Sequence, residues 1–282
     1  MNRALLILIS ILFFTSCAFR SILRDKEITY TNGVMDRSLP QKELNVFSPK
    51  KGTDHPVLIF YYGGSWESGK KEIYDFMGSR LARRGLVVVI PDYPLAPDYQ
   101  INDMENAGVE ALLWAKYNVA KYGGDPDKII VNGHSAGAHL ASLLALKDEI
   151  WDSLGMGNPI AGAILNDPAG LDMKWFLEET RESGEGERYY NAFTDQPDVW
   201  EKYSTIYYLD NPEVPTLILE GERTYPGIRM AVARFRAKAD SLGIPIDYSF
   251  HPKKKHIPMI TQYFWTWSQG FDDILDFVEK LD

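Results

Sequence analysis

Runs of apolar, often β-branched residues alternate along this chain with segments whose apolar residues recur at helical spacing. The runs predict buried strands at 57–62, 86–91, 128–132, 161–166, 215–220 and 246–251. The helical spacing predicts helices at 74–84, 103–122 and 229–242, and each of them is followed by a glycine that suits a helix end. Strands that alternate with helices predict an α/β fold with a mostly parallel central sheet and helices on both faces.

Composition limits the class of protein. With 282 residues and 45% hydrophobic content, the chain is long enough for one large α/β domain, which we expect over residues 28–282. The formal net charge is -9, and Lys253–Lys255 is the one dense basic stretch. A nucleic-acid partner is therefore not expected.

The first residues resemble a bacterial lipoprotein signal. Arg3 precedes an apolar stretch at 4–14 that is too short to span a bilayer, and Phe14-Thr15-Ser16-Cys17 resembles a lipobox with Phe14 in place of the usual leucine. We expect residues 1–17 to be a signal that ends at Cys17, the lipid-attachment residue, and residues 18–27 to be a tether. An ordinary cleaved signal peptide is the alternative. Either reading predicts export to the cell envelope, and the first predicts a lipid anchor in a bacterial membrane.

The clearest chemical motif lies where the strand at 128–132 ends. Ser135 stands between Gly133 and Gly137 and is followed by a helix-forming stretch from Ala138 to Lys147. This order of strand, sharp turn and helix is the G-x-S-x-G nucleophile elbow. The tight turn lifts a serine hydroxyl away from the sheet, towards a base and free backbone N–H groups.

One long segment interrupts the alternation of strands and helices. Residues 171–213 carry a polar run at 182–188 and many aromatic side chains: Trp175, Phe176, Tyr189, Tyr190, Phe193, Trp200, Tyr203, Tyr207 and Tyr208. Such an insertion after a strand predicts a partial lid over a substrate cleft. The alternative is that most of these rings form the buried faces of connecting helices.

Three further motifs accompany the elbow in order: Tyr61–Trp66, Asp92–Pro97 and Tyr122–Asp127. Together with Gly133–Ala141 they resemble the esterase branch of the α/β-hydrolases, which includes hormone-sensitive-lipase-like carboxylesterases, feruloyl and acetylxylan esterase-like proteins and kynurenine formamidases. The resemblance covers about 46–278. It implies the α/β-hydrolase fold and serine-dependent acyl hydrolysis.

The resemblance also implies roles for individual residues. Ser135 corresponds to the nucleophile, and the backbone N–H groups of Gly64, Ser65 and Ala136 correspond to the oxyanion hole. The base in such enzymes is a histidine that comes late in the sequence. His251 and His256 both come late, and we favour His256 because we expect it in a loop after the last strand, free to reach the serine.

The acid of the triad is the open question. Relatives have Gly-Glu-x-Asp where this chain has Gly221-Glu222-Arg223-Thr224, so a threonine occupies the position of the expected aspartate. Without an acid, the histidine would lose the group that fixes its tautomer. Glu222 is nearest to the lost position and is our first choice, and Asp167, after the strand at 161–166, is the alternative. Glu220 or the absence of any acid remains open.

The sequence therefore predicts a serine-dependent carboxylic-ester hydrolase that forms an acyl-enzyme on a small or carbohydrate-linked ester. An aryl-formamide or amide hydrolase on the same scaffold is one alternative. A degenerate binding protein is the other, because Tyr62, Ser65 and Thr224 replace residues of the family's catalytic loops. We expect no metal and no organic cofactor, because a serine nucleophile with a histidine base needs neither. The lack of metal-ligand histidine spacing agrees with this expectation.

Overall fold

The computed structural model describes residues 21–209 and 214–281, and within them eight strands form one sheet in the order β1-β2-β4-β3-β5-β6-β7-β8. The strands are β1 (Ile22–Thr29), β2 (Glu43–Pro49), β3 (His55–Tyr61), β4 (Val87–Pro91), β5 (Gly124–His134), β6 (Ile160–Asn166), β7 (Thr216–Arg223) and β8 (Ile246–Lys255). The longer helices are α2 (Asp75–Ala82), α3 (Ile101–Asn118), α4 (Ala136–Leu146), α9 (Pro226–Leu242) and α11 (Gln269–Lys280).

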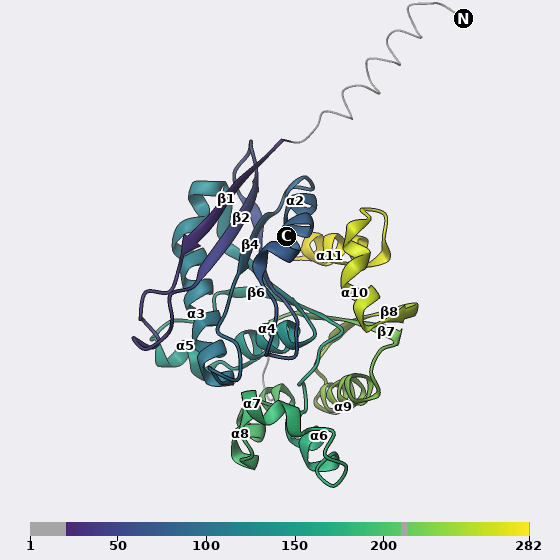
Figure 1. Ribbon diagram of the computed structural model, residues 1–282. Helices are drawn as coiled ribbons and strands as arrows, with labels where there is room; N and C mark the ends of the chain where they lie inside the picture. Colours follow the sequence, from purple (N-terminus) through teal and green to yellow (C-terminus); the bar gives the residue numbers. More distant parts are fainter. Residues whose placement is uncertain (1–20, 210–213, 282) are drawn as a thin grey trace, which may run out of the picture.

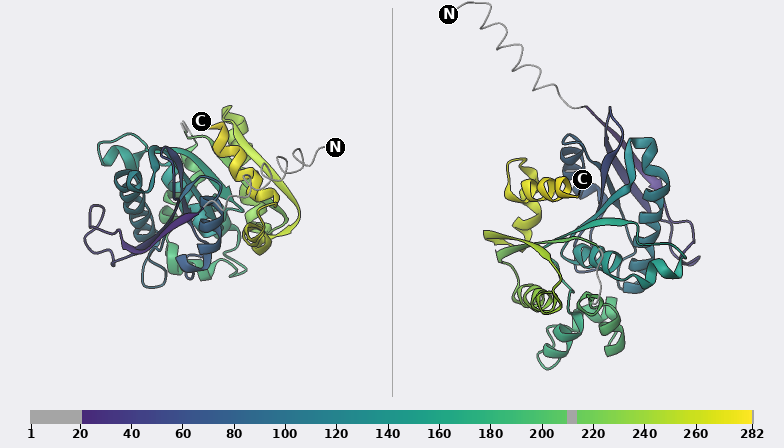
Figure 2. Two further views of the ribbon diagram at one scale, coloured as in Figure 1. Left: turned by 90° about the horizontal axis from the view of Figure 1, so that it is seen from above. Right: turned by 180° about the vertical axis from the view of Figure 1, so that it is seen from behind.

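Strands β3 to β8 run parallel, and β2 lies antiparallel to both β1 and β4. Helices α3, α4 and α9 cover one face of the sheet, while α2 and α11 cover the other (Figures 1 and 2). This arrangement confirms the predicted α/β fold. All six predicted strands are present. Five of them contain a largely buried run that the hydrophobic pattern reveals, whereas the edge strand β8 is mostly half-buried or exposed.

The N-terminal edge of the sheet corrects the predicted tether. Residues 22–27 belong to β1, where Ile22 pairs with Pro49 and Asp25 with Val46. The side chains of this edge strand are mostly exposed, so the sequence there reads as polar although its backbone is hydrogen-bonded to β2. The expected signal and Cys17 lie outside the described residues. Among the residues described, every helix is too short or too polar to cross a lipid bilayer.

The segment between β6 and β7 folds into short helices below the carboxyl ends of the strands (Figure 1). They are α6 (Met173–Glu179), η3 (Glu187–Tyr189), α7 (Tyr190–Phe193), α8 (Pro197–Lys202) and η4 (Thr205–Tyr208). Phe193 and Trp200 are fully buried, whereas Tyr207 is exposed, so part of the aromatic content forms the core of this segment. Residues 210–213 of the predicted lid lie outside the described residues.

Candidate active site

Ser135 occupies the sharp turn between β5 and α4. Its backbone has φ 57° and ψ -123°, a strained conformation for a residue with a side chain. A Cβ atom on Gly133 would lie 2.2 Å from the backbone of Gly137, and a Cβ on Gly137 would lie 2.0 Å from the carbonyl oxygen of Tyr61. Both glycines are therefore required for the close approach of α4 to β3 and β5, and that approach presents the serine hydroxyl at the end of the sheet.

His256 lies beside this serine. Its Nε2 atom is 2.9 Å from Ser135 Oγ, and its Nδ1 atom is 2.6 Å from Asp167 Oδ2. A carboxylate only accepts hydrogen bonds, so Nδ1 carries the proton and Nε2 offers its lone pair to the serine hydroxyl. His256 begins the short helix α10 (His256–Thr261) directly after β8, instead of lying in a loop.

Asp167 directly follows β6 and is fully buried. Its Oδ1 atom accepts a hydrogen bond of 3.0 Å from the backbone N–H of Gly221, and its Oδ2 atom accepts one from the hydroxyl of Thr224. Thr224 stands where the family resemblance places an aspartate. The threonine thus keeps a polar contact at that position, but as a donor to the carboxylate that comes from the preceding strand.

The preference for Glu222 as the partner of the histidine is wrong. Strand β7 continues through Glu222, which is held against the neighbouring strand by a hydrogen bond from the backbone N–H of Lys253 to its Oε2. Glu220 accepts a hydrogen bond of 2.9 Å from the hydroxyl of Tyr248. Both glutamates of β7 therefore accept hydrogen bonds from β8, and neither is hydrogen-bonded to His256.

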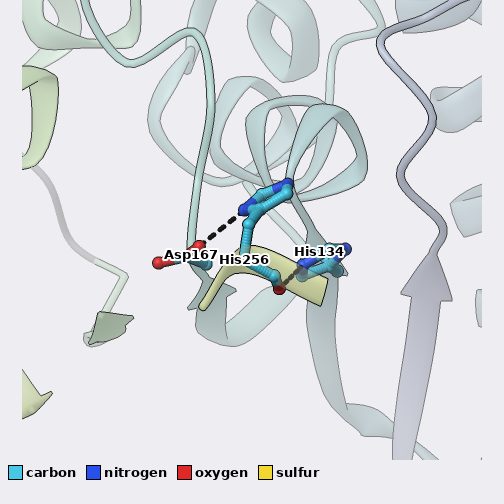
Figure 3. Close-up of side chains that lie close together, drawn as sticks. All are labelled: His134, Asp167 and His256. Carbon is cyan, nitrogen blue, oxygen red and sulfur yellow. Dashed lines mark hydrogen bonds and ion pairs between the residues drawn. The ribbon is translucent and has the colours of Figure 1, made fainter. Parts of the chain in front are cut away.

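The other histidines near the motif have separate partners. His134 donates from Nε2 to the backbone carbonyl oxygen of His256 at 3.1 Å (Figure 3). Burial, with a contribution from the neighbouring His256, lowers the pKa of His134 to about 3, so its ring is neutral at pH 7. His251 lies within β8 with its Nε2 2.8 Å from Asp273, which explains why it does not reach the serine.

The loop after β3 lies over Ser135. Gly64 has φ 139° and Ser65 has φ 55°, and the carbonyl oxygen of Gly64 accepts hydrogen bonds from Glu67 and Ser68. Throughout the described ranges, the backbone N–H groups of Gly64, Ser65 and Ala136 have no acceptor within the protein. These predicted oxyanion donors are thus unoccupied. Gly64 and Ser65 also line the cavity that opens above Ser135 and His256.

Tyr62 replaces the histidine of the family loop. Its hydroxyl donates to Asp92 Oδ1 at 3.0 Å, and its ring stacks on Tyr93 with the centroids 4.6 Å apart. Asp92 also accepts hydrogen bonds from Lys71. Tyr62 therefore supports the loop from behind through a network that Asp92 holds together.

A cavity of about 500 Å³ opens above Ser135 and His256. The predicted lid supplies one wall of it, with Met173, Phe176, Glu185, Arg188 and Tyr189. The lid is attached through Trp66, whose ring makes edge contacts with Tyr189 and Phe193 at centroid distances of 5.6 and 4.9 Å. The placement agrees with a partial lid, although opening and closing remain a prediction.

Sequence reasoning missed Tyr225 and Arg188. The Tyr225 ring lies 4.9 Å from the His256 ring and lines the cavity. Arg188 pairs with Glu67 at 3.6 Å and is the one arginine or lysine among the lining residues. No local motif marks either residue, because each is brought to the cavity by the folding of segments that are far from Ser135 in the sequence.

Within the described part of the chain, His134, Asp167 and His256 form the one group with the donor types of a metal site, and their ligand atoms lie within 4.8 Å of one another. The oxygens of Asp167 already accept three hydrogen bonds. A metal ion would have to displace these donors. The contacts therefore suit an acid–histidine pair better than a metal centre.

Comparison with known proteins places this geometry in a family. The model of the BD-FAE family matches residues 44–225, well over half of the chain, including Ser135 and Asp167. The chain belongs to the BD-FAE family. Esterase LipQ of Mycobacterium tuberculosis is 30% identical to this BD-FAE member over 220 residues, which are 73% of this chain and 51% of LipQ.

A probable isoprenylcysteine alpha-carbonyl methylesterase, ICMEL1 of Oryza sativa subsp. japonica, is 34% identical over 142 residues, half of this chain and 31% of the relative. The BD-FAE chain thus spans between about a third and a half of these two curated relatives. An inhibited esterase B from Lactobacillus rhamnosis superposes with a TM-score of 0.77 at 18% identity, covering 99% of this chain and 97% of the other. This likeness confirms the α/β-hydrolase fold.

Proposed function

We propose that this protein is a serine-dependent carboxylic-ester hydrolase that works through an acyl-enzyme. The observation that carries the proposal is the continuous chain of hydrogen bonds from Asp167 through His256 to Ser135 at the floor of the cavity. Ser135 Oγ attacks the ester carbonyl while His256 Nε2 takes the hydroxyl proton. The histidine then returns this proton to the leaving alcohol. In the second half of the reaction, water attacks the acyl-enzyme and gives a proton to His256 Nε2. The histidine passes this proton to Ser135 Oγ as the carboxylic acid leaves.

The free backbone donors above the serine support the same reaction. The N–H groups of Gly64, Ser65 and Ala136 are available to the negative charge that develops on the carbonyl oxygen. Loss of one such donor costs about 3 kcal/mol in characterised enzymes. Asp167 holds the imidazole in the required tautomer and stabilises it when it becomes positively charged.

The cavity and the relatives support a small or carbohydrate-linked ester as the substrate class. A volume of about 500 Å³ accommodates a compact acyl or alcohol group, and the cavity combines aromatic walls with the charge of Arg188. The named relatives are esterases. An aryl-formamide would meet the same groups, so parallel assays with p-nitrophenyl acetate and an N-formyl arylamine measure the preference.

A fluorophosphonate probe tests the proposal directly. We expect one probe per chain on the wild type, no labelling of Ser135→Ala, and unchanged labelling of the exposed control Ser183→Ala. Hydrolysis of p-nitrophenyl acetate should follow the labelling. A well-folded wild type that neither labels nor hydrolyses would contradict the enzyme and favour the degenerate binding protein.

We further propose that the protein is exported and anchored to a bacterial membrane through a lipid on Cys17. The pattern of Arg3, the apolar stretch at 4–14 and the lipobox-like residues 14–17 supports this. Because β1 begins at Ile22, the chain from Cys17 to the sheet can span at most about 18 Å. Such an anchor would keep the folded domain close to the lipid surface.

A further inference from the structure

An aromatic patch lies exposed at one corner of the molecule. It consists of Ile73, Phe76, Phe264, Trp265 and Trp267. Trp267 is 77% exposed, Ile73 53%, Trp265 49% and Phe264 44%, and the Phe264 ring stacks on Phe76 at a centroid distance of 3.7 Å. The Phe264 ring also contacts the Trp265 ring, with the centroids 6.2 Å apart. Large apolar side chains gathered on a surface in this way mark a contact with a partner.

The patch lies near the point where the described chain begins. Helix α2 joins the two regions: Ser79 accepts a hydrogen bond of 3.2 Å from Arg24 of β1, and Arg84 donates one of 3.4 Å to the carbonyl oxygen of Thr266. In both Figure 1 and the view from above in Figure 2, α2 lies between the start of β1 and the loop before α11. Helix α2 and the turn that follows it therefore contact both the first residues of β1 and the loop that carries Trp265 and Trp267.

Three arginines lie on helix α2 or directly after it, beside the aromatic patch. Helix α2 carries Arg80 and is followed by the exposed Arg83 and Arg84, although the chain has a formal net charge of -9. The Arg80 guanidinium lies over the Phe76 ring, 6.0 Å from its centroid. Tryptophan favours the boundary between headgroups and acyl chains, and arginine binds lipid phosphates. Both residue types are present here on one surface.

We propose that the aromatic patch docks on the surface of a phospholipid bilayer that carries anionic headgroups. The reach of about 18 Å from Cys17 to Ile22 would keep the start of β1, and helix α2 beside it, close to the membrane. Tyr74, between Ile73 and Phe76, lines the catalytic cavity, so docking would place the cavity beside the lipid surface. The proposal rests on the proposed anchor and is independent of the proposed ester hydrolysis.

Tryptophan quenching tests this contact in the full chain. The protein is reconstituted into vesicles of phosphatidylcholine and phosphatidylglycerol with brominated acyl chains, which quench only tryptophans at the bilayer. We expect strong quenching in the wild type. Trp265→Ser/Trp267→Ser should remove it, because the other tryptophans in the described residues are partly or fully buried. Quenching that persists in this double variant overturns the proposal, as does an unquenched wild type.

A second variant keeps the reporting tryptophans and reverses two positive charges beside them. Arg83→Glu/Arg84→Glu should weaken quenching on these vesicles, whereas the control Arg37→Glu/Lys121→Glu, two exposed cations elsewhere, should not. Equal quenching in the two charge variants contradicts the predicted role of the arginines.

Two other occupants would also overturn the proposal. Binding to insoluble xylan that is lost in the tryptophan variant, without lipid quenching, would identify a carbohydrate surface. A concentration-dependent dimer lost in the same variant would identify a second copy of the chain. Hydrolysis of p-nitrophenyl acetate by each variant separates this question from catalysis, since it should remain at the wild-type rate in all of them.

Discussion

At the scale of single residues, the site is organised around Asp167. Its carboxylate receives hydrogen bonds from Gly221, Thr224 and His256, three residues that lie 54, 57 and 89 positions further along the chain. These contacts bring the ends of β6, β7 and β8 to one point. The position of the carboxylate thus depends on the packing of the whole carboxyl edge of the sheet.

Removing the acid should nearly abolish turnover. Asp167→Asn keeps the shape of the side chain but permits the wrong tautomer of His256, and we expect kcat to fall about ten-thousandfold, as in other triads. Glu222→Gln is the matched control and should retain most of the activity, because Glu222 contacts Lys253 instead. Steady-state kinetics on p-nitrophenyl acetate measure both, and equal losses would refute the assignment.

The threonine that replaces the family aspartate permits a swap experiment. Thr224→Asp in the wild type should lower activity, because two carboxylates would then meet at one site. In the Asp167→Asn background the same change should restore part of the lost kcat, because the new carboxylate stands where relatives hold theirs. A double variant no more active than Asp167→Asn would show that position 224 cannot hold an acid for His256.

Ser135 and His256 could be proposed from the sequence, whereas the acid could not be chosen correctly. The elbow is local: strand, two glycines and helix follow one another, and each has a recognisable pattern. The choice between Asp167 and Glu222 depends on where β7 ends. That strand continues to Arg223 and turns Glu222 towards β8, a detail of sheet pairing that no local pattern reveals.

At the scale of elements, the hydrophobic pattern predicted the six parallel strands but neither of the antiparallel strands, β1 and β2. Strand β1 is held by backbone pairing with β2 while most of its side chains are exposed, so hydropathy carries no signal for it. Strand β2 is buried, but its sequence mixes polar and apolar residues instead of forming a continuous apolar run. The lid segment was recognised by its aromatic content. Its attachment to the domain, through Trp66 and through His139, became visible only in the structure.

His139 connects α4 to the lid segment and should make stability depend on pH. Its Nε2 donates to the carbonyl oxygen of Tyr203 at 2.7 Å, and burial lowers its pKa to about 4. Between pH 6.5 and 4 the unfolded chain binds a proton there that the folded chain does not, so stability falls as pH decreases. The slope is about 1.4 kcal/mol per pH unit for one such histidine.

Urea unfolding of the wild type and His139→Gln at pH 7 and pH 5 measures this contribution. The glutamine can donate to the same carbonyl but takes up no proton on unfolding. The stability advantage of the wild type at pH 7 should therefore shrink at pH 5. The neighbouring buried His134 contributes in the same direction in both proteins, and parallel pH dependences of the two proteins would exclude a role for His139.

At the scale of the whole molecule, two regions matter for the proposals: the catalytic cavity and the aromatic patch. The carboxyl ends of β5, β6 and β8 carry the catalytic candidates, and the predicted lid segment supplies one wall of the cavity there. Figure 1 shows this segment below the sheet. The aromatic patch lies on α2 and the residues just before it and on the segment between α10 and α11, and α2 also contacts β1, where the described chain begins. Because β1 is part of the sheet and begins at Ile22, only residues 18–21 separate the folded domain from Cys17.

The lipid anchor is tested by metabolic labelling with radioactive palmitate in a bacterial host. Wild-type protein should incorporate the label, and Cys17→Ala should not, because Cys17 is the only cysteine of the chain. Ser16→Ala is the matched control, since it changes a neighbouring residue and leaves the thiol in place. Label in the Cys17 variant, or none in the wild type, would contradict the anchor.

The position of Asp167 has a consequence for how such enzymes diversify. Where the acid follows β7, the loop that carries it must stay nearly unchanged for proton transfer to continue. Here that loop keeps only a hydroxyl and a backbone N–H directed at the carboxylate, while its following residues, Tyr225 to Ile228, face the cavity. Under the proposed hydrolysis, side chains at this wall can therefore change to suit a different ester while the hydrogen bonds from Asp167 through His256 to Ser135 stay in place.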